Sequence, residues 1–263
     1  MEKYIKFATI KFMSNFENPF NNIIEILETL LFFVIYWYVF RTLYQGKQTV
    51  DGITCSMAVT AMLLSIGFDY SYYKGKMYIQ EKMRQGTLLV ELIKPVDFRL
   101  RLLFEDMGKT LFFVVFRYLP VVLIAMLFAN LQGPKSSFHF ILFFISVFLG
   151  YIISWLFDFV CNEMAFFTLS VWGIVSIKNA LIDVFGGVFV PVWFLPVVVR
   201  HILIFTPVLS IYYIPVNLYF GLYDGVKMIL AILYQILWIV LLGWISDRVW
   251  KRGIDQVILK GAG

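Results

Sequence analysis

Few side chains in this sequence are of the types that perform catalysis or hold metals, and they are widely spaced. The two histidines, His139 and His201, have no carboxylate or cysteine at the spacing of metal ligands. The two cysteines, Cys55 and Cys161, lie in apolar segments without a CxxC pair. Burial as small hydrophobic side chains is the simplest interpretation of both. The sequence therefore predicts no metal site and no redox site.

Phosphate-binding and hydrolytic motifs are also missing. The sequence contains no GxxxxGK[ST] phosphate loop, no GxGxxG, no HExxH and no GxSxG. One enzymatic alternative stays open, in which Asp158, Glu163 or His201 acts as an acid or base in a membrane enzyme that modifies lipids. Such an enzyme would be active as an isolated chain without ATP. The scarcity of polar residues argues against it.

The composition indicates that lipid, and not water, is the main solvent of this chain. Of its 263 residues, 61% are hydrophobic and 15% are charged, whereas a soluble domain is nearer half apolar and a quarter charged. The net charge of +5 could suggest a nucleic-acid partner. However, the basic residues lie in loops between apolar runs, which is typical of topology signals in a membrane protein. We therefore expect contact with membrane lipids and none with nucleic acid.

The apolar runs predict an all-α membrane protein with six transmembrane helices, forming a single transmembrane domain over residues 1–263. A membrane helix needs roughly 20 predominantly apolar residues. The windows that meet this requirement are residues 23–40, 53–70, 110–129, 138–160, 164–182 and 226–246. No apolar run of a cleaved signal peptide precedes them.

The segment at 183–222 is apolar but cannot be one straight helix. It is interrupted by Gly186 and Gly187 and by four prolines, namely Pro191, Pro196, Pro207 and Pro215. Each proline removes a backbone donor and kinks or ends a helix. Broken backbone at membrane depth is tolerated where protein or a water-filled cavity shelters it. The pattern predicts a re-entrant helical hairpin before the last span.

The distribution of basic residues predicts the orientation. Most of them lie in the N-terminal segment, in the loop at 73–109 and in the tail at 247–263. With an even number of spans, all three fall on one face, which the positive-inside rule assigns to the cytoplasm. We therefore expect a multi-pass protein of the inner (plasma) membrane with both termini in the cytoplasm.

Two segments of that face have helical periodicity. Residues 1–21 mix aromatic side chains with Lys3, Lys6 and Lys11, which predicts an amphipathic helix along the headgroups. In the loop, Leu88, Leu89, Leu92 and Ile93 have helical spacing, and Pro95 stops the helix. A loop of this length in a compact protein is usually functional or disordered. Its periodicity favours function.

Arg117 and Asp158 are ionisable residues inside the predicted spans. Arg117 is in the third span and Asp158 is near the end of the fourth. Charges within a membrane are costly and usually have a partner or a function. Two roles stay open for Arg117 and Asp158, either pairing with each other or lining a substrate path.

The arrangement resembles the permease subunits of type-2 ABC exporters, in the bacterial branch of about 260 residues. The loop sequence from Arg84-Gln85-Gly86-Thr87-Leu88 to Leu92-Ile93-Lys94-Pro95 is similar to a signature of that branch. The late run of Gly187, Pro191, Phe194, Pro196, Pro207, Tyr212 and Pro215 also resembles it. So does the plan of an amphipathic helix, six spans and a cytoplasmic loop after the second span. The resemblance covers nearly the whole chain.

The resemblance implies a permease that works with other polypeptides. Two permease chains, as a homodimer or heterodimer, would each bind a separate ATP-binding subunit. ATP and Mg²⁺ would be bound there, with no cofactor in this chain. The coupling residues would be Gln85, Gly86, Thr87, Leu88, Leu89, Glu91, Leu92, Lys94 and Pro95. The late run at 183–222 would form a re-entrant gate near the outer face.

A secondary transporter is a further alternative. Such proteins usually have broken helices in both halves, whereas residues 1–110 contain no counterpart of the proline-rich segment. The aromatic spans favour an amphiphilic substrate for export. Aromatic side chains also serve in packing and at membrane interfaces, so a drug, peptide, lipid or polysaccharide carrier all stay open.

Overall fold

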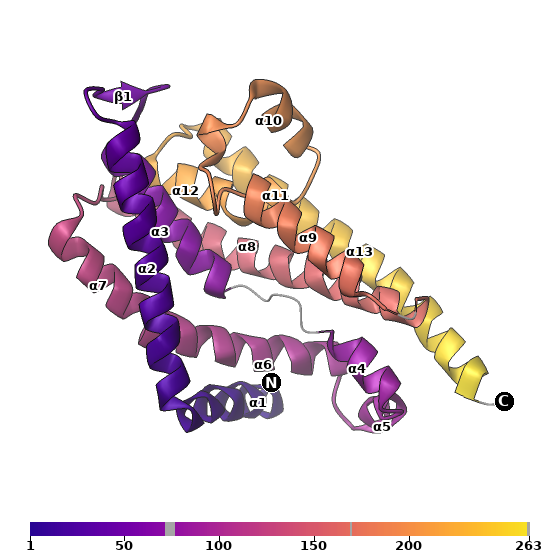
Figure 1. The fold of residues 1–263 in the computed structure, drawn as a ribbon. Coiled ribbons are helices and arrows are strands. Elements are labelled where there is room, and N and C mark those ends of the chain that lie inside the picture. Colours follow the sequence, from indigo (N-terminus) through magenta and orange to yellow (C-terminus); the bar gives the residue numbers. More distant parts are fainter. Residues whose placement is uncertain (72–76, 169, 262–263) are drawn as a thin grey trace.

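The computed structural model describes residues 1–71, 77–168 and 170–261, which are mostly helical (Figure 1). In chain order the helices are α1 Glu2–Ser14, α2 Pro19–Leu43, α3 Cys55–Ser71, α4 Tyr78–Arg84, α5 Leu88–Ile93, α6 Phe98–Phe113, α7 Leu119–Phe128, α8 Ser137–Glu163, α9 Trp172–Phe185, α10 Val197–Leu203, α11 Val208–Ile211, α12 Tyr213–Phe220 and α13 Val226–Gly261. Turns of 3-10 helix cover Asn15–Glu17, Met164–Phe166 and Val192–Phe194, and a π-helical turn covers Val114–Tyr118. Strands β1 Thr49–Val50 and β2 Ile53–Thr54 form an antiparallel hairpin.

Four of the described helices are long and apolar enough to cross a membrane. They are Pro19–Leu43, Phe98–Phe128, Ser137–Phe166 and Val226–Val257. Each coincides with one of the predicted spans, at 23–40, 110–129, 138–160 and 226–246, the second of which extends one residue past the helix end. The molecule is therefore a multi-pass helical membrane protein, as the composition predicts.

The other two predicted spans coincide with shorter helices. The apolar part of α3 is Cys55–Asp69, within the predicted span at 53–70. The prediction for 164–182 was wrong in its boundaries, because α8 and a 3-10 turn continue to Phe166 and α9 begins only at Trp172. At 1.5 Å per residue, the 14 residues of α9 extend about 21 Å, less than the roughly 30 Å of the hydrocarbon core.

The helix that contains the third predicted span begins earlier than predicted. It starts at Phe98, inside the segment predicted as a loop, where the side chain of Asp97 accepts a hydrogen bond of 2.8 Å from the Leu100 N–H and caps the helix. It then runs through the π-helical turn into α7. Pro120 follows this turn and has no N–H to donate to the carbonyl of Phe116. The wider turn accommodates this break in the hydrogen-bond ladder.

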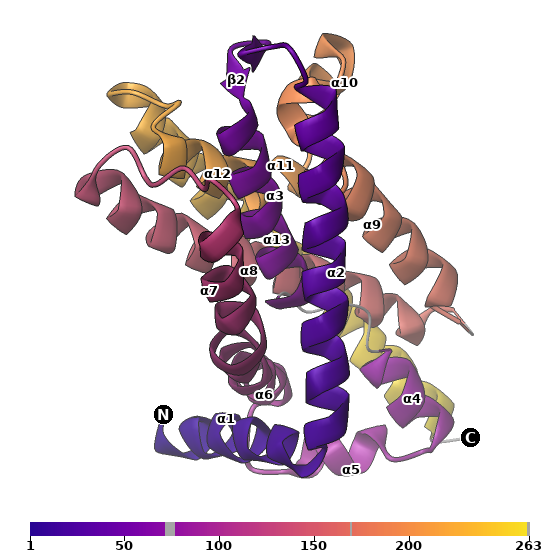
Figure 2. The same ribbon diagram turned by 60° about the vertical axis from the view of Figure 1, so that its left-hand side comes forward.

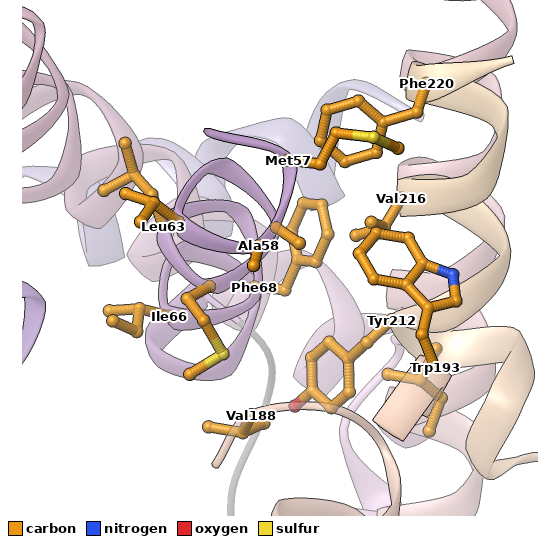
Figure 3. Packing of buried hydrophobic residues seen from close by; sticks show 14 of the residues in the cluster. Met57, Ala58, Leu63, Ile66, Phe68, Val188, Trp193, Tyr212, Val216 and Phe220 are labelled. Carbon is orange, nitrogen blue, oxygen red and sulfur yellow. The ribbon is translucent and has the colours of Figure 1, made fainter. Parts of the chain in front are cut away.

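Helix α8 is central to the packing. It contacts α9, α11, α12 and α13. The largest core cluster joins α3 to the segment that follows α9. Figure 3 shows Phe68 of α3 beside Tyr212, and the two rings are stacked with centroids 6.1 Å apart. The short helices α11 and α12 are therefore held between α3 and α8.

Helix α1 runs roughly perpendicular to α2 from its N-terminal end (Figure 2). It packs on α6. This contact is close because Gly108 of α6 has no side chain. A Cβ atom at this position would lie 2.1 Å from the carbonyl oxygen of Ala8. Phe12 and Phe16 extend the contact, each in an edge-to-face arrangement with Phe112. The N-terminal helix thus belongs to the folded domain.

We expect Gly108→Ala to destabilise the protein, because the added methyl group must push α1 away from α6. In an open helix position, glycine to alanine adds up to about 1 kcal/mol of stability. Gly243→Ala in α13 is the matched control, since a Cβ there meets nothing within 4 Å. Thermal unfolding in one detergent should show opposite shifts for the two variants. A Gly108 variant as stable as the wild type would contradict the close contact.

Candidate functional site

The predicted coupling segment is a helix–turn–helix. Helix α4 ends in a turn in which the Thr87 N–H donates to the Lys82 carbonyl and the Gly86 N–H donates to the Met83 carbonyl, each at 3.0 Å. This pattern is a Schellman motif, which places one residue in the left-handed region. Gly86 occupies that position with φ of +65°, and a side chain there would strain the backbone. Helix α5 ends at Ile93, before Pro95, as the sequence predicts.

Glu91 holds this segment together through three cations. Its carboxylate contacts Lys94 at 2.7 Å, Arg101 at 2.8 Å and Lys82 at 3.3 Å. Burial alone would raise the pKa of Glu91. Hydrogen bonds from Lys94 and Arg101 outweigh this effect and lower the pKa from 4.5 to about 2. Because Lys82 is in α4 and Arg101 is in α6, Glu91 ties both helices to α5.

The two faces of α5 differ. Leu88 is buried at 2% exposure, in a cluster with Phe98 of α6 and Trp155 of α8. Val90 and Ile93 are 61% and 82% exposed. The segment therefore exposes apolar side chains on one face of α5, while Leu88 on the other face is buried in the core.

The remaining predicted coupling residues have mixed positions. Leu92 packs against the buried cluster, and Leu89 is exposed. Gln85 follows the last residue of α4, Thr87 precedes the first residue of α5, and the exposed Lys94 follows α5. Sequence reasoning missed Val90, whose exposure depends on the direction of α5. It also missed Arg101, because the sequence does not show that α6 folds back onto this segment.

Three of the predicted gate residues line one small cavity. Gly187, Pro191 and Tyr212 enclose it together with Ala61 and Ser65 of α3. The Tyr212 hydroxyl donates to Asp69 at 3.2 Å. The broken segment therefore packs directly against α3, as the view in Figure 3 shows.

The other gate residues lie elsewhere in the segment. Phe194 stacks on Phe40 of α2 with ring centroids 6.2 Å apart. Pro196 and Pro207 immediately precede α10 and α11, and Pro215 is buried in the first turn of α12. These positions suit proline, since the first-turn N–H groups of a helix have no partner within the helix. The prolines thus begin short helices.

Side chains of α13 bond to carbonyl groups that the broken segment leaves free. The Tyr234 hydroxyl shares its single proton between the carbonyls of Ile204 and Thr206, the latter at 3.0 Å. The Gln235 amide donates to the Ser210 carbonyl at 2.8 Å and accepts from the Ser146 hydroxyl at 2.9 Å. These bonds satisfy polar backbone groups that would otherwise be costly in apolar surroundings.

The suggested pair of Arg117 and Asp158 is wrong, because each has a different partner. Arg117 forms an ion pair with Glu25 of α2 and donates to Asn22 at 2.5 Å. Asp158 pairs with Lys178 of α9 at 2.5 Å, and both side chains are almost completely buried. The two pairs therefore join different helices.

The residues of the enzymatic alternative have structural partners in the described part of the chain, with the exception of His201. Asp158 is paired with Lys178, and Glu163 accepts a hydrogen bond of 2.8 Å from Ser246. His201 is exposed on α10. Within residues 1–71, 77–168 and 170–261, no group of three metal-ligating side chains occurs.

Long apolar helices, paired charges within them and a broken segment at the centre define a multi-pass helical membrane protein. The sequence profile of the ABC-2 family transporter proteins matches residues 23–261. The chain therefore belongs to the ABC-2 transporter family, as the resemblance in sequence predicts. No curated protein matches the chain significantly.

We expect Lys178→Met to destabilise the protein by about 3–5 kcal/mol, since it leaves Asp158 buried without its cation. The double variant Asp158→Asn with Lys178→Met should recover part of this loss, because it removes the unpaired charge. Unfolding in increasing SDS concentrations measures both. A double variant no more stable than Lys178→Met would show that charge pairing is not the cause.

Glu91→Gln should lower the free energy of opening of the segment of α4 and α5 by about 3 kcal/mol at neutral pH. This is the energy that corresponds to lowering the Glu91 pKa from 4.5 to about 2. The stabilisation is complete above the unfolded pKa near 4.5 and is lost as the pH falls toward 2. Hydrogen exchange of residues 78–95 measures the change. Glu81→Gln, at an exposed position of α4, is the control and should exchange like the wild type.

Proposed function

We propose that this chain is the permease subunit of an ABC exporter and that a separate ATP-binding subunit drives it. The observation that carries the proposal is the exposed apolar face of α5, with Leu89, Val90 and Ile93. Glu91 joins this helix to α4 and α6. An exposed apolar patch rimmed by polar residues is typical of a protein interface. Two copies of the ATP-binding subunit, each with ATP and Mg²⁺, would dock on the two permease chains of the complex.

The position of α5 supports this role. Helices α1, α4 and α5 and the C-terminus lie at one end of the molecule, and the β hairpin and α10 lie at the other (Figure 1). Much of the basic charge is in these N-terminal, loop and C-terminal segments. By the positive-inside rule this end faces the cytoplasm, where ATP is available. We therefore infer that both termini are cytoplasmic and that the membrane is the plasma membrane.

We further propose six crossings of the membrane. The helices would be α2, α3, the continuous α6 and α7, α8, α9 and α13. The broken segment with α10, α11 and α12 would form the re-entrant hairpin. The short α3 and α9 fit this topology because their ends pack on the broken segment, which covers part of the membrane thickness.

Movement of the ATP-binding subunits would reach the membrane domain through α5 and α6. The contact between Glu91 and Arg101 joins these helices, and α6 continues through the π-helical turn into α7. ATP binding would shift the populations of inward-open and outward-open states, to the extent that the docked subunits favour one of them. The cavity beside Tyr212 marks where α3 and the gate would separate.

A second permease chain is part of the proposal. Only 17% of the spanning window of α2 is buried, so α2 has room for a partner helix as well as for lipid. The aromatic spans favour an amphiphilic substrate, carried between two such chains.

The test is the double variant Val90→Asp with Ile93→Asp. We expect loss of co-purification with the ATP-binding subunit, because two charges replace apolar contact area, while membrane insertion is retained. The control is Val90→Leu with Ile93→Leu, which keeps the surface apolar and should keep the complex. Undiminished co-purification of the aspartate variant would overturn the assignment of α5 as the coupling helix.

A further inference from the structure

The last helix, α13, has one exposed face that is apolar along the uncharged run and cationic directly after it. No charged residue lies between Lys227 and Asp247, a run about 28 Å long at 1.5 Å per residue. This length matches the hydrocarbon core of a bilayer. Helix α13 continues beyond it to Gly261. The residues directly after Ser246 therefore lie at the depth of the lipid headgroups.

The apolar part of this face is made of Leu237, Val240 and Trp244, which are 60%, 64% and 55% exposed. Their spacing of three and four residues places them on one side of the helix. The opposite side, with Gln235 and Ser246, is buried against the rest of the domain. The exposed side is thus the one available to acyl chains.

The same side continues as Arg248, Lys251 and Arg252, which are all exposed. The Arg248 guanidinium lies over the Trp244 ring at 5.0 Å from its centroid, so the apolar and cationic parts are joined. None of the three cations forms an ion pair within the described residues. The adjacent acid, Asp247, is bound by Arg99 at 2.5 Å, although Asp255 is exposed one turn further along.

We propose that this face, Trp244 with Arg248, Lys251 and Arg252, binds an anionic phospholipid. The acyl chains lie along Leu237 and Val240, and the phosphodiester lies among the three cations. Arginine binds phosphate oxygens through its planar guanidinium, and clustered basic residues beside a membrane helix favour anionic headgroups. A zwitterionic lipid carries its own cation and gains less. The proposal depends on α13 spanning the membrane and not on coupling to ATP.

The side of α13 opposite the three cations packs on the start of α6. There, Trp250 stacks on Phe98 with ring centroids 5.5 Å apart, and Asp247 binds Arg99. Both partners are in the first turn of α6, beside α5. Lipid bound on one side of α13 would therefore contact a helix whose other side packs on the start of α6.

The experiment is native mass spectrometry of the purified full chain with phosphatidylglycerol or phosphatidylcholine added. We expect the wild type to prefer phosphatidylglycerol, and this preference to fall as salt screens the charges. The triple variant Arg248→Gln, Lys251→Gln and Arg252→Gln should bind phosphatidylglycerol on the order of a hundredfold more weakly. The matched control removes the same charge elsewhere on the surface, as Lys3→Gln, Lys47→Gln and Lys227→Gln, and should keep the preference.

A charge-retaining variant, Arg248→Lys, Lys251→Arg and Arg252→Lys, separates lipid binding from folding, because it should keep the preference if charge is the cause. Equal binding of the two lipids by the wild type would overturn the proposal. So would an unchanged preference in the glutamine variant. Loss of the ATP-binding subunit without a change in lipid preference would assign the cations to the protein partner instead.

Discussion

The fold depends on how the broken backbone between α9 and α13 finds hydrogen-bond partners. Chain that is not helical leaves carbonyl groups free, and hydrocarbon offers them no donor. In this molecule the donors come from α13, where Tyr234 and Gln235 reach the carbonyls of Thr206 and Ser210. The last spanning helix is therefore a structural support of the segment proposed as the gate. A movement of that segment must break or exchange these bonds.

Charged side chains join neighbouring helices through ion pairs, both within the spanning helices and outside them. Lys178 and Asp158 neutralise each other between α9 and α8, and Arg117 is bound by Glu25. Outside the spans, Glu91 has three cationic partners and holds a segment whose apolar face is open. The ion pairs thus hold neighbouring helices together, and the exposed apolar face of α5 remains available to a partner protein.

The sequence predicts those features that depend on neighbours along the chain. Four spanning helices, the stop at Pro95 and the break after α9 follow from hydropathy and proline, which act locally. The start of α6 at Phe98 was missed because its first turns are amphipathic and have the composition of a loop. The shortness of α9 was missed because Met164–Phe166 is apolar yet extends α8.

The partners of the charged residues were not predictable for a different reason. Arg117 binds a residue 92 positions away, and Arg101 reaches α5 only because α6 folds back on it. Hydropathy does not encode such contacts between distant segments. The exposed face of α5 likewise depends on which side of a six-residue helix meets Phe98 and Trp155.

The pairing of Arg117 with Glu25 also bears on the synthesis of the protein. Asp158 and Lys178 are 20 residues apart and emerge from the ribosome almost together, as neighbouring helices. Glu25 emerges 92 residues before its arginine, an interval of about 5–18 s at usual rates of translation. During that time the Glu25 carboxylate of α2 lacks its arginine partner, although Asn21 of the same helix can still donate to it. The ion pair that joins α2 to the π-helical turn can form only after Arg117 has been synthesised.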